Sequence, residues 1–73
     1  MKDNVNHPDH YTQGGLETIE IIKEVASKYT GFEASLVGNV VKYIDRANFK
    51  DNKLQDLQKA RWYLDRLIKE VEQ

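Results

Sequence analysis

The sequence predicts an all-α domain of three helices with an extended N-terminal arm, in which helices two and three form an antiparallel hairpin. Three observations predict this fold. Apolar residues recur at steps of three and four in three successive segments after residue 15, which is the spacing of a helix face. The first 15 residues show no such period and carry the only proline, Pro8, and a Gly14-Gly15 pair. A short connection, residues 49–52, separates the second and third segments and makes them antiparallel.

The length of 73 residues indicates one domain, with residues 1–15 as the arm and residues 16–73 as the helices. A core this small rarely supplies more than about 3–5 kcal/mol on its own. There are no cysteines, which excludes disulfides and thiolate metal sites. We therefore expect support from further copies of the chain, as a homo-oligomer (a dimer, a tetramer or above).

The first helix is predicted from Leu16, where the apolar period begins. Glu17 and Glu20 fall in its first turn, where a carboxylate interacts favourably with the helix dipole. Thr30-Gly31 is predicted to end the helix, because glycine adopts the left-handed geometry of a helix cap. The apolar stripe of this helix is Leu16, Ile19, Ile22, Val25, Ala26 and Tyr29.

The second helix is predicted from Glu33 to about Asn48 by the same periodicity. Gly38 lies inside it at a cost of roughly 1 kcal/mol relative to alanine, which a close helix contact or a close ligand would explain. The stripe expected to be buried is Leu36, Val37, Val40, Val41, Ile44 and Ala47.

The third helix is predicted to begin after Asn52, which forms a capping box with Gln55, and to run to about Val71. Its apolar stripe is Leu54, Leu57, Ala60 or Arg61, Leu64, Ile68 and Val71.

Positive charge is concentrated in one part of the chain. The net charge is −1, yet residues 38–63 carry six Lys or Arg against three Asp. That distribution suits a small anion better than a long nucleic acid.

No apolar run approaches the roughly 20 residues that span a membrane, and the N-terminus lacks the apolar core of a signal peptide. We therefore expect a soluble, cytoplasmic protein without a membrane partner.

Two helix faces combine cations with aromatic rings at helical spacing. Cations contact phosphate oxygens, and rings offer flat surfaces on which a base stacks. The alternative for the first face is a solvated surface with ion pairs, in which Arg46 reaches Asp56 across the hairpin. The alternative for the second is that Trp62 and Tyr63 pack in the core or at an interface. The faces are Asn39, Lys42, Tyr43 and Arg46, then Lys59, Trp62, Tyr63 and Arg66.

The arm carries a second cluster, His7-Pro8-Asp9-His10-Tyr11. It could close over a ligand or simply dock on the helices. A metal site is disfavoured, because zinc takes three or four protein ligands and the chain has no cysteine and no third histidine. The row Glu17, Glu20 and Glu24 has no second acidic pair to hold magnesium with it, so we interpret it as helix-dipole compensation.

Standard catalytic signatures are missing from the sequence. There is no G-x-x-x-x-G-K-[ST] phosphate loop, no G-x-G-x-x-G and no G-x-S-x-G. Neither Ser27 nor Ser35 has a histidine nearby in sequence. The chain offers poor material for a self-contained active site, so we expect binding rather than catalysis and assign no catalytic residue.

Four motifs in this order resemble a small phage protein family, which is described as a domain of unknown function or as a phage nucleotide kinase. They are H-P-D-H-Y at 7–11, G-x-E-T-I-E at 15–20, G-N-V-V-K-Y-I-D-R-A at 38–47 and D-L-Q-K-A-R-W-Y-L at 56–64. The resemblance covers roughly residues 7–68. By the family pattern, the implied ligand contacts are His7, His10, Tyr11, Asn39, Lys42, Tyr43, Arg46, Lys59 and Tyr63.

The resemblance implies two activities. A larger phage member is associated with phosphorylating deoxynucleoside monophosphates without a P-loop. Small helical phage proteins of similar appearance sequester the cyclic nucleotide signals of CBASS-type bacterial immunity. This chain amounts to little more than the shared motifs, which favours binding over catalysis.

The function expected from the sequence is therefore a phage nucleotide-binding protein in the host bacterial cytoplasm, an anti-CBASS sponge that sequesters cyclic dinucleotides without turnover. One alternative is a nucleoside monophosphate kinase of phage nucleotide metabolism. Another is a structural or host-protein-binding module. The sponge needs no cofactor and no metal, whereas the kinase would need magnesium.

Overall fold

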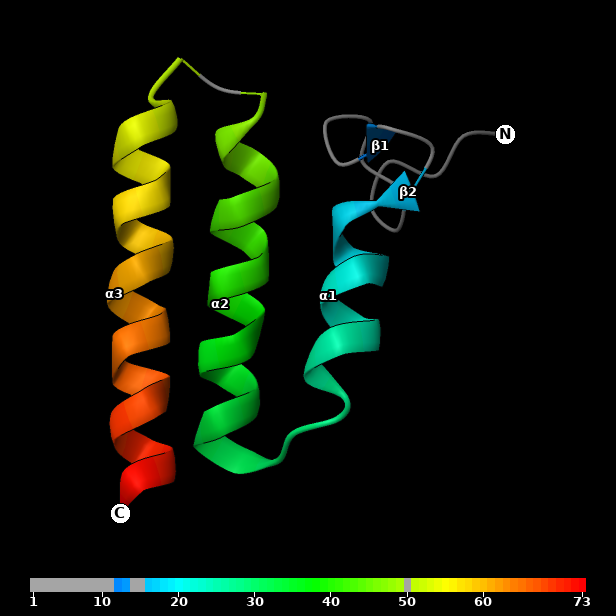
Figure 1. Ribbon diagram of the computed structural model, residues 1–73. Coiled ribbons are helices and arrows are strands. Elements are labelled where there is room, and N and C mark those ends of the chain that lie inside the picture. Colours follow the sequence, from blue (N-terminus) through cyan, green and yellow to red (C-terminus); the bar gives the residue numbers. More distant parts are fainter. Residues whose placement is uncertain (1–11, 14–15, 50) are drawn as a thin grey trace.

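Three helices lie side by side in one layer in the computed structural model, which describes residues 12–13, 16–49 and 51–73 (Figure 1). The helices are α1 (Thr18–Ala26), α2 (Gly31–Ala47) and α3 (Lys53–Glu72). The central helix, α2, packs against α1 on one side and most extensively against α3 on the other. The predicted three-helix, all-α fold and the α2–α3 hairpin are thereby confirmed.

A two-stranded ladder precedes α1. The strands β1 (Thr12–Gln13) and β2 (Leu16–Glu17) are antiparallel, with Thr12 opposite Glu17 and Gln13 opposite Leu16. The prediction that Leu16 begins the first helix is wrong, because its backbone is part of this ladder. Glu17 is still extended, at φ −74° and ψ 138°, and α1 begins one residue later. The rest of the predicted arm, residues 1–11 and 14–15, lies outside the described residues.

The first helix also ends earlier than predicted. After Ala26 the hydrogen bonds reach back three residues, from Lys28 N–H to Val25 and from Tyr29 N–H to Ala26. This tightening ends the α-helical turn and leaves Tyr29 exposed, although its spacing placed it in the apolar stripe. Gly31 has the left-handed geometry expected of it, at φ +59°, as the first residue of α2.

Only a few apolar side chains are fully buried in the described part of the chain. They are Leu36, Val37, Ala47 and Ala60. Leu36, Val37 and Ala47 belong to the stripe predicted for the second helix, and Val40 and Val41 are partly buried as well. Ile44 was predicted in the same stripe but is exposed. Small side chains such as Ala47 and Ala60 let α2 and α3 approach closely.

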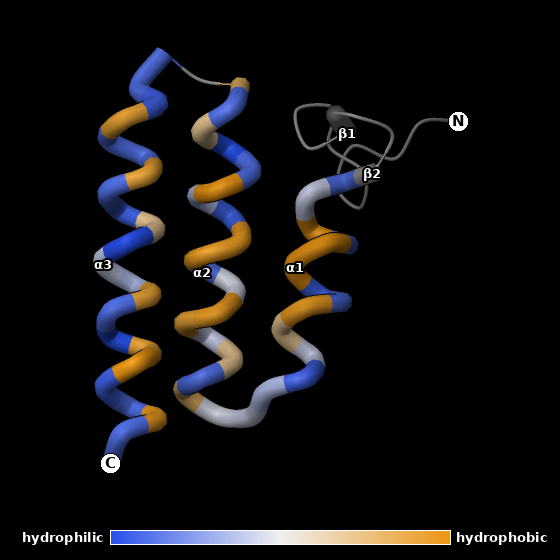
Figure 2. The backbone as a smooth tube through the Cα atoms, in the orientation of Figure 1, coloured by the Kyte–Doolittle hydropathy of each residue, from blue (hydrophilic) through white to orange (hydrophobic). Residues whose placement is uncertain are grey.

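The face that α3 turns toward α2 differs from the predicted one. The apolar period did predict a helix here, and hydrophobic residues recur along it (Figure 2). However, the large apolar residues of the predicted stripe are exposed, from 38% at Leu57 to 69% at Leu54. The buried positions of α3 are Asp56 and Ala60, of which the predicted stripe allowed only Ala60. Asn52 is the N-cap of α3, as the predicted capping box requires. Its side chain makes no capping hydrogen bond, so the box itself does not form.

Two contacts hold α1 against α2. The buried hydroxyl of Thr18 donates a 2.5 Å hydrogen bond to Asp45 Oδ2. Gly38 faces Ile22, whose Cγ2 would lie 3.4 Å from a β-carbon built at residue 38. Gly38 thus lies at the contact between α1 and α2, although the 3.4 Å separation leaves room for a β-carbon there. None of the helices in the described residues has the length and hydrophobicity needed to cross a membrane.

Replacing each of two glycines by alanine is expected to change stability in opposite directions. Gly38→Ala gains up to about 1 kcal/mol of helix propensity, because a β-carbon 3.4 Å from Ile22 makes an ordinary van der Waals contact. Gly31→Ala loses about 1 kcal/mol or more, because an L side chain is strained at φ +59°. Urea unfolding of both variants and the parent measures the two free energies. A loss in Gly38→Ala would show that Ile22 cannot yield and that α1 is displaced.

Candidate functional site

Two tyrosines stack on each other across the α2–α3 hairpin. The ring centroids of Tyr43 and Tyr63 lie 5.8 Å apart and their planes are inclined by 12°. Trp62 meets Tyr63 edge-on, at 5.1 Å and 83°. Both arrangements are among the favourable geometries of aromatic pairs. The three rings therefore form one group contributed by two helices.

Two lysines approach the same ring. Lys42 Nζ lies 4.6 Å from the centroid of the Tyr43 ring, and Lys59 Nζ lies 5.5 Å from it. Both distances are within the range of cation–π attraction. Lys42 comes from α2 and Lys59 from α3, so the packing of the hairpin brings the two ammonium groups together. We call this set the cation–tyrosine cluster; its members are Lys42, Tyr43, Lys59, Trp62 and Tyr63.

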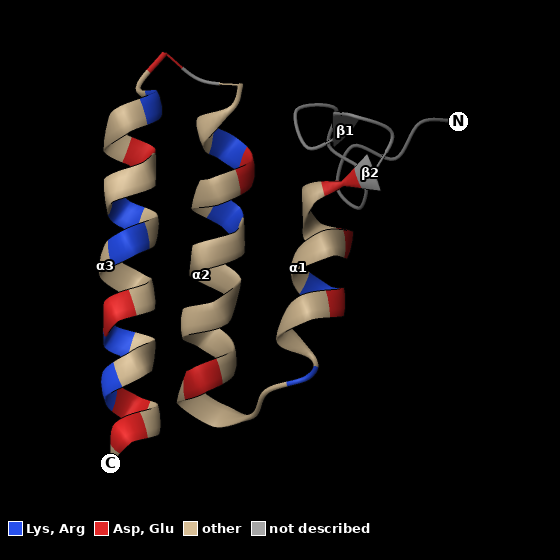
Figure 3. Ribbon diagram, in the orientation of Figure 1, with Lys and Arg blue, Asp and Glu red and all other residues tan. Residues whose placement is uncertain are grey.

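The charge of the cluster is not balanced locally. Within the described part of the chain, neither Lys42 nor Lys59 forms an ion pair with a carboxylate. Figure 3 shows that the positive residues of α2 gather in its C-terminal half, beside basic residues of α3. Two like charges near one ring repel each other, and an anion placed between them would remove that repulsion. The cluster is thus suited to an anionic ligand.

Arg46 lies one turn beyond Lys42 and pairs with Asp56 across the hairpin. Arg46 Nε lies 3.6 Å from Asp56 Oδ2, and the Asp56 residue is only 2% exposed. This is the ion pair that the sequence allowed as an alternative to ligand binding. About half of the Arg46 side chain stays exposed, at 49%, so its outer nitrogens remain accessible at the edge of the cluster.

Asn39 and Arg66, which share faces with these residues, make contacts of their own. Asn39 Nδ2 donates a 3.0 Å hydrogen bond to the carbonyl oxygen of Ser35 within α2. Arg66 donates to Glu70 from Nη2 at 2.8 Å, and its guanidinium lies 5.3 Å from the ring of Phe32. The Arg66 side chain therefore contacts Glu70 and Phe32 and is not a member of the group around Tyr43.

The predicted ligand contacts are thus partly assembled. Lys42, Tyr43, Lys59 and Tyr63 come together, with Arg46 beside them and Asn39 one turn away on α2. His7, His10 and Tyr11 lie outside the described residues.

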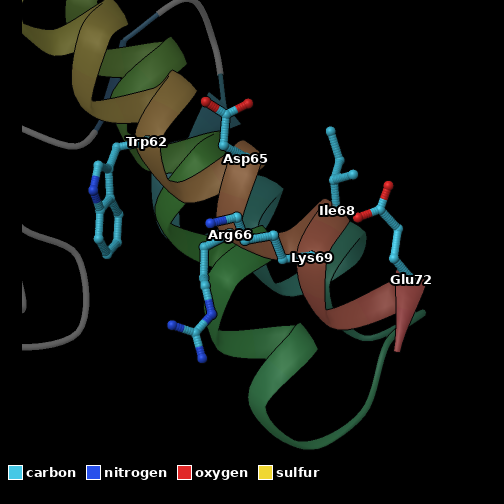
Figure 4. Close-up of a pocket in the computed structure, with 6 residues that line it drawn as sticks. All are labelled: Trp62, Asp65, Arg66, Ile68, Lys69 and Glu72. Atoms are coloured by element: carbon cyan, nitrogen blue, oxygen red, sulfur yellow. The ribbon is translucent and has the colours of Figure 1, made fainter.

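A shallow depression on α3 borders the cluster (Figure 4). It is lined by Trp62, Asp65, Arg66, Ile68, Lys69 and Glu72. All of these residues belong to α3, so no second element closes the depression. A recess with one wall offers little enclosure to a small molecule, and we place the candidate site at the cation–tyrosine cluster.

Sequence reasoning missed that the two tyrosines stack on each other. Its leading interpretation treated the rings as surfaces for a base, and its alternative packed Trp62 and Tyr63 in the core or at an interface without pairing Tyr63 with Tyr43. A partial signal was present: in an antiparallel hairpin, residues at similar distances from the connection face each other. Arg46 and Asp56 lie on either side of residues 49–52 in this way. Tyr63 lies farther from the connection than Tyr43, so this spacing alone did not pair the two rings.

The family of the chain follows from its sequence as a whole. Residues 5–65 match the model of DUF3310, a family of proteins of unknown function. The match covers most of the chain, and the protein belongs to this family. No curated protein and no solved structure matches it.

Removing the Arg46 guanidinium is expected to destabilise the fold, since it leaves the buried carboxylate of Asp56 without its partner. Arg46→Ala should lower the free energy of unfolding by about 1–3 kcal/mol. The double variant Arg46→Ala/Asp56→Asn should be more stable than Arg46→Ala, because the amide carries no buried charge. Urea unfolding measures each value. Arg66→Ala is the control: it breaks a more exposed pair within one helix and should change stability by about 0.5 kcal/mol or less. Equal small losses in both arginine variants would contradict a structural role for the Arg46 pair.

Proposed function

We propose that this protein binds a nucleotide at the cation–tyrosine cluster. One observation carries the proposal: two lysine ammonium groups from different helices converge on the ring of Tyr43, at 4.6 and 5.5 Å. Among the described residues neither has a carboxylate partner. Phosphate oxygens would supply the missing negative charge.

Arg46 adds a third cation on the same side of the hairpin. Asp56 contacts the inner nitrogen, Nε, at 3.6 Å. The two outer nitrogens of a guanidinium together make a fork that matches two phosphate oxygens. Asp56 would thus hold Arg46 in place for a ligand as well as stabilising the hairpin.

A base would stack on Trp62 rather than between the tyrosines. The Tyr43 and Tyr63 rings already cover each other, at 5.8 Å between centroids, which leaves no room for a third ring. Trp62 is 60% exposed, and its contact with Tyr63 is T-shaped rather than stacked. An exposed indole stacks on any base and contributes about 1–3 kcal/mol per base. Asn39 lies one turn from the lysines and can contact the sugar or phosphate.

The ligand that we propose is a cyclic dinucleotide, which the protein sequesters without altering it. The resemblance to phage proteins that act against CBASS-type immunity supports this choice, and on that reading the protein would act in the host cytoplasm. The site also favours affinity over chemistry: the carboxylate that contacts its neighbour Arg46, Asp56, is buried and held in that ion pair. His7, His10 and Tyr11 would contact the same ligand from the arm.

A panel of nucleotides tests the proposal directly. The purified protein is melted with cyclic dinucleotides, linear dinucleotides, dTMP, dGMP and ATP. A ligand at 100 times its dissociation constant should add about 2.7 kcal/mol of stability. We expect a cyclic dinucleotide to give the largest shift and to be recovered intact after denaturation.

The other outcomes of this panel separate the alternatives. Transfer of labelled phosphate from ATP to dTMP or dGMP would overturn the sponge and support a nucleoside monophosphate kinase that uses magnesium. The absence of a thermal shift with every nucleotide would overturn nucleotide binding and support a structural or host-protein-binding module.

Neutralising either lysine of the cluster is expected to weaken binding selectively. Lys42→Gln and Lys59→Gln each remove one charged contact, worth about 1.5–3 kcal/mol, so Kd should rise roughly 10- to 100-fold. Lys23→Gln on α1 is the matched control and should leave Kd within about twofold. Isothermal titration with the ligand from the panel measures the three values. Equal Kd values in all three variants would contradict the placement of the ligand at this cluster.

A further inference from the structure

An apolar stripe runs along the exposed side of α3. Its members are spaced alternately by three and four residues, which is the heptad pattern of helices that pair with another helix. Apart from one arginine they are apolar, and each of the apolar members is exposed, Leu64 for example at 44%. We call this stripe the α3 seam; its members are Leu54, Leu57, Arg61, Leu64, Ile68 and Val71.

The seam is separate from the face that α3 uses within the chain. Asp56 and Ala60 face α2 and are buried, and Tyr63 stacks on Tyr43 of that helix. The seam lies on the next face around α3, away from the cation–tyrosine cluster. Figure 4 shows Trp62 of the cluster and Ile68 of the seam, which lie at different heights along α3, pointing to different sides of the helix, with the depression that both line between them.

The central helix contributes to the same apolar side. Ile44 of α2 is 52% exposed, and it lies about half a turn around α2 from Lys42 and Arg46. Since the two cations mark the side that carries the cluster, Ile44 is on the other side of the layer, with the α3 seam. Domains normally consist of two packed layers around one core, and the described residues provide a single layer.

We propose that a second copy of this chain covers the α3 seam in an antiparallel, two-fold symmetric arrangement. The register of the seam fits this partner. When Arg61 lies opposite Leu64 of the partner subunit, Leu57 lies opposite Ile68 of the partner subunit, and Leu54 lies opposite Val71 of the partner subunit. Every seam position then meets another seam position, as a two-fold axis requires.

The single charge in the seam selects the antiparallel arrangement. In a parallel pair, Arg61 would lie beside the partner's Arg61 in the same core layer, and the two positive charges would repel. In the antiparallel pair, Arg61 enters the space around the partner's Leu64 and meets the adjacent carboxylate of the partner's Asp65. Asp65 is exposed beside the seam, and within the described residues it forms no ion pair. Two such Arg–Asp contacts arise, one on each side of the axis.

This dimer is independent of nucleotide binding. The seam and Ile44 become buried between two layers, which gives each chain the core that a single layer lacks. The cation–tyrosine clusters face outward on both sides of the dimer. Each chain therefore keeps its own ligand site, and loss of the dimer and loss of the ligand site can be measured separately.

Substitution in the seam tests the interface. We expect light scattering on the parent to give twice the chain mass of 8.5 kDa, or a higher even multiple. Leu64→Glu should reduce the mass to that of one chain, because a buried carboxylate without a partner opposes association. Phe32→Glu changes a similarly exposed apolar residue, 52% against 44%, that contacts Arg66 away from the seam, and should leave the mass unchanged. A parent that is monomeric at 100 micromolar would overturn the proposal and leave this face to a different protein.

Cysteine cross-linking tests the register even if Leu64→Glu fails to fold. The chain has no cysteine, so introduced thiols have no competitors. Leu57→Cys/Ile68→Cys should give a covalent dimer on mild oxidation, because these positions face each other between copies. Within one helix they lie about 16 Å apart, too far for a disulfide. Leu57→Cys alone should give little dimer. Cross-linking of the single variant as efficiently as the double one would indicate parallel pairing and overturn the antiparallel register.

Discussion

The contact between α2 and α3 is the constraint on which the rest of the structure depends. Its centre is a buried carboxylate, Asp56, whose ion pair with Arg46 crosses the hairpin at 3.6 Å. A buried charge restricts the register of the two helices, since sliding one helix past the other would leave the charge unpaired. The register that this pair maintains also places Tyr63 on Tyr43 and brings Lys59 to the same ring. The cation–tyrosine cluster therefore exists because the hairpin has one register.

A single layer of helices has two broad faces, and this chain gives them different chemistry. One face carries the lysines and rings of the cluster, and the other carries the α3 seam and Ile44. The few buried apolar side chains of the described residues lie between the helices, within the layer. An apolar face without a second layer leaves the hydrophobic effect largely unused in the isolated chain. The fold is thus suited to association through one face and to ligand contact through the other.

The sequence predicted the number and type of the helices and the hairpin, and it allowed the Arg46–Asp56 pair as an alternative to ligand binding, because these follow from periodicity and from distances to a short connection. It did not predict which side of α3 meets α2. Two stripes compete on that helix, one apolar and one containing Asp56, Ala60 and Tyr63. Hydrophobicity favours the first, but the packing partners on α2 select the second. The start of α1 was missed for a similar reason, since the ladder between β1 and β2 determines it.

The lysines of the cation–tyrosine cluster differ from the other cations of the hairpin in where they lie. On α2 and α3 the chain pairs Arg46 with Asp56 and Arg66 with Glu70. Carboxylates are thus available at this spacing, yet Lys42 and Lys59 have none within the described ranges, although the fold brings both to one ring. Lys53, Arg61 and Lys69 of α3 also have no ion pair in the described ranges, so what distinguishes Lys42 and Lys59 is their convergence on one ring. Two ammonium groups at one half-buried tyrosine ring, with the exposed Trp62 beside it, are the features on which the proposed nucleotide site rests.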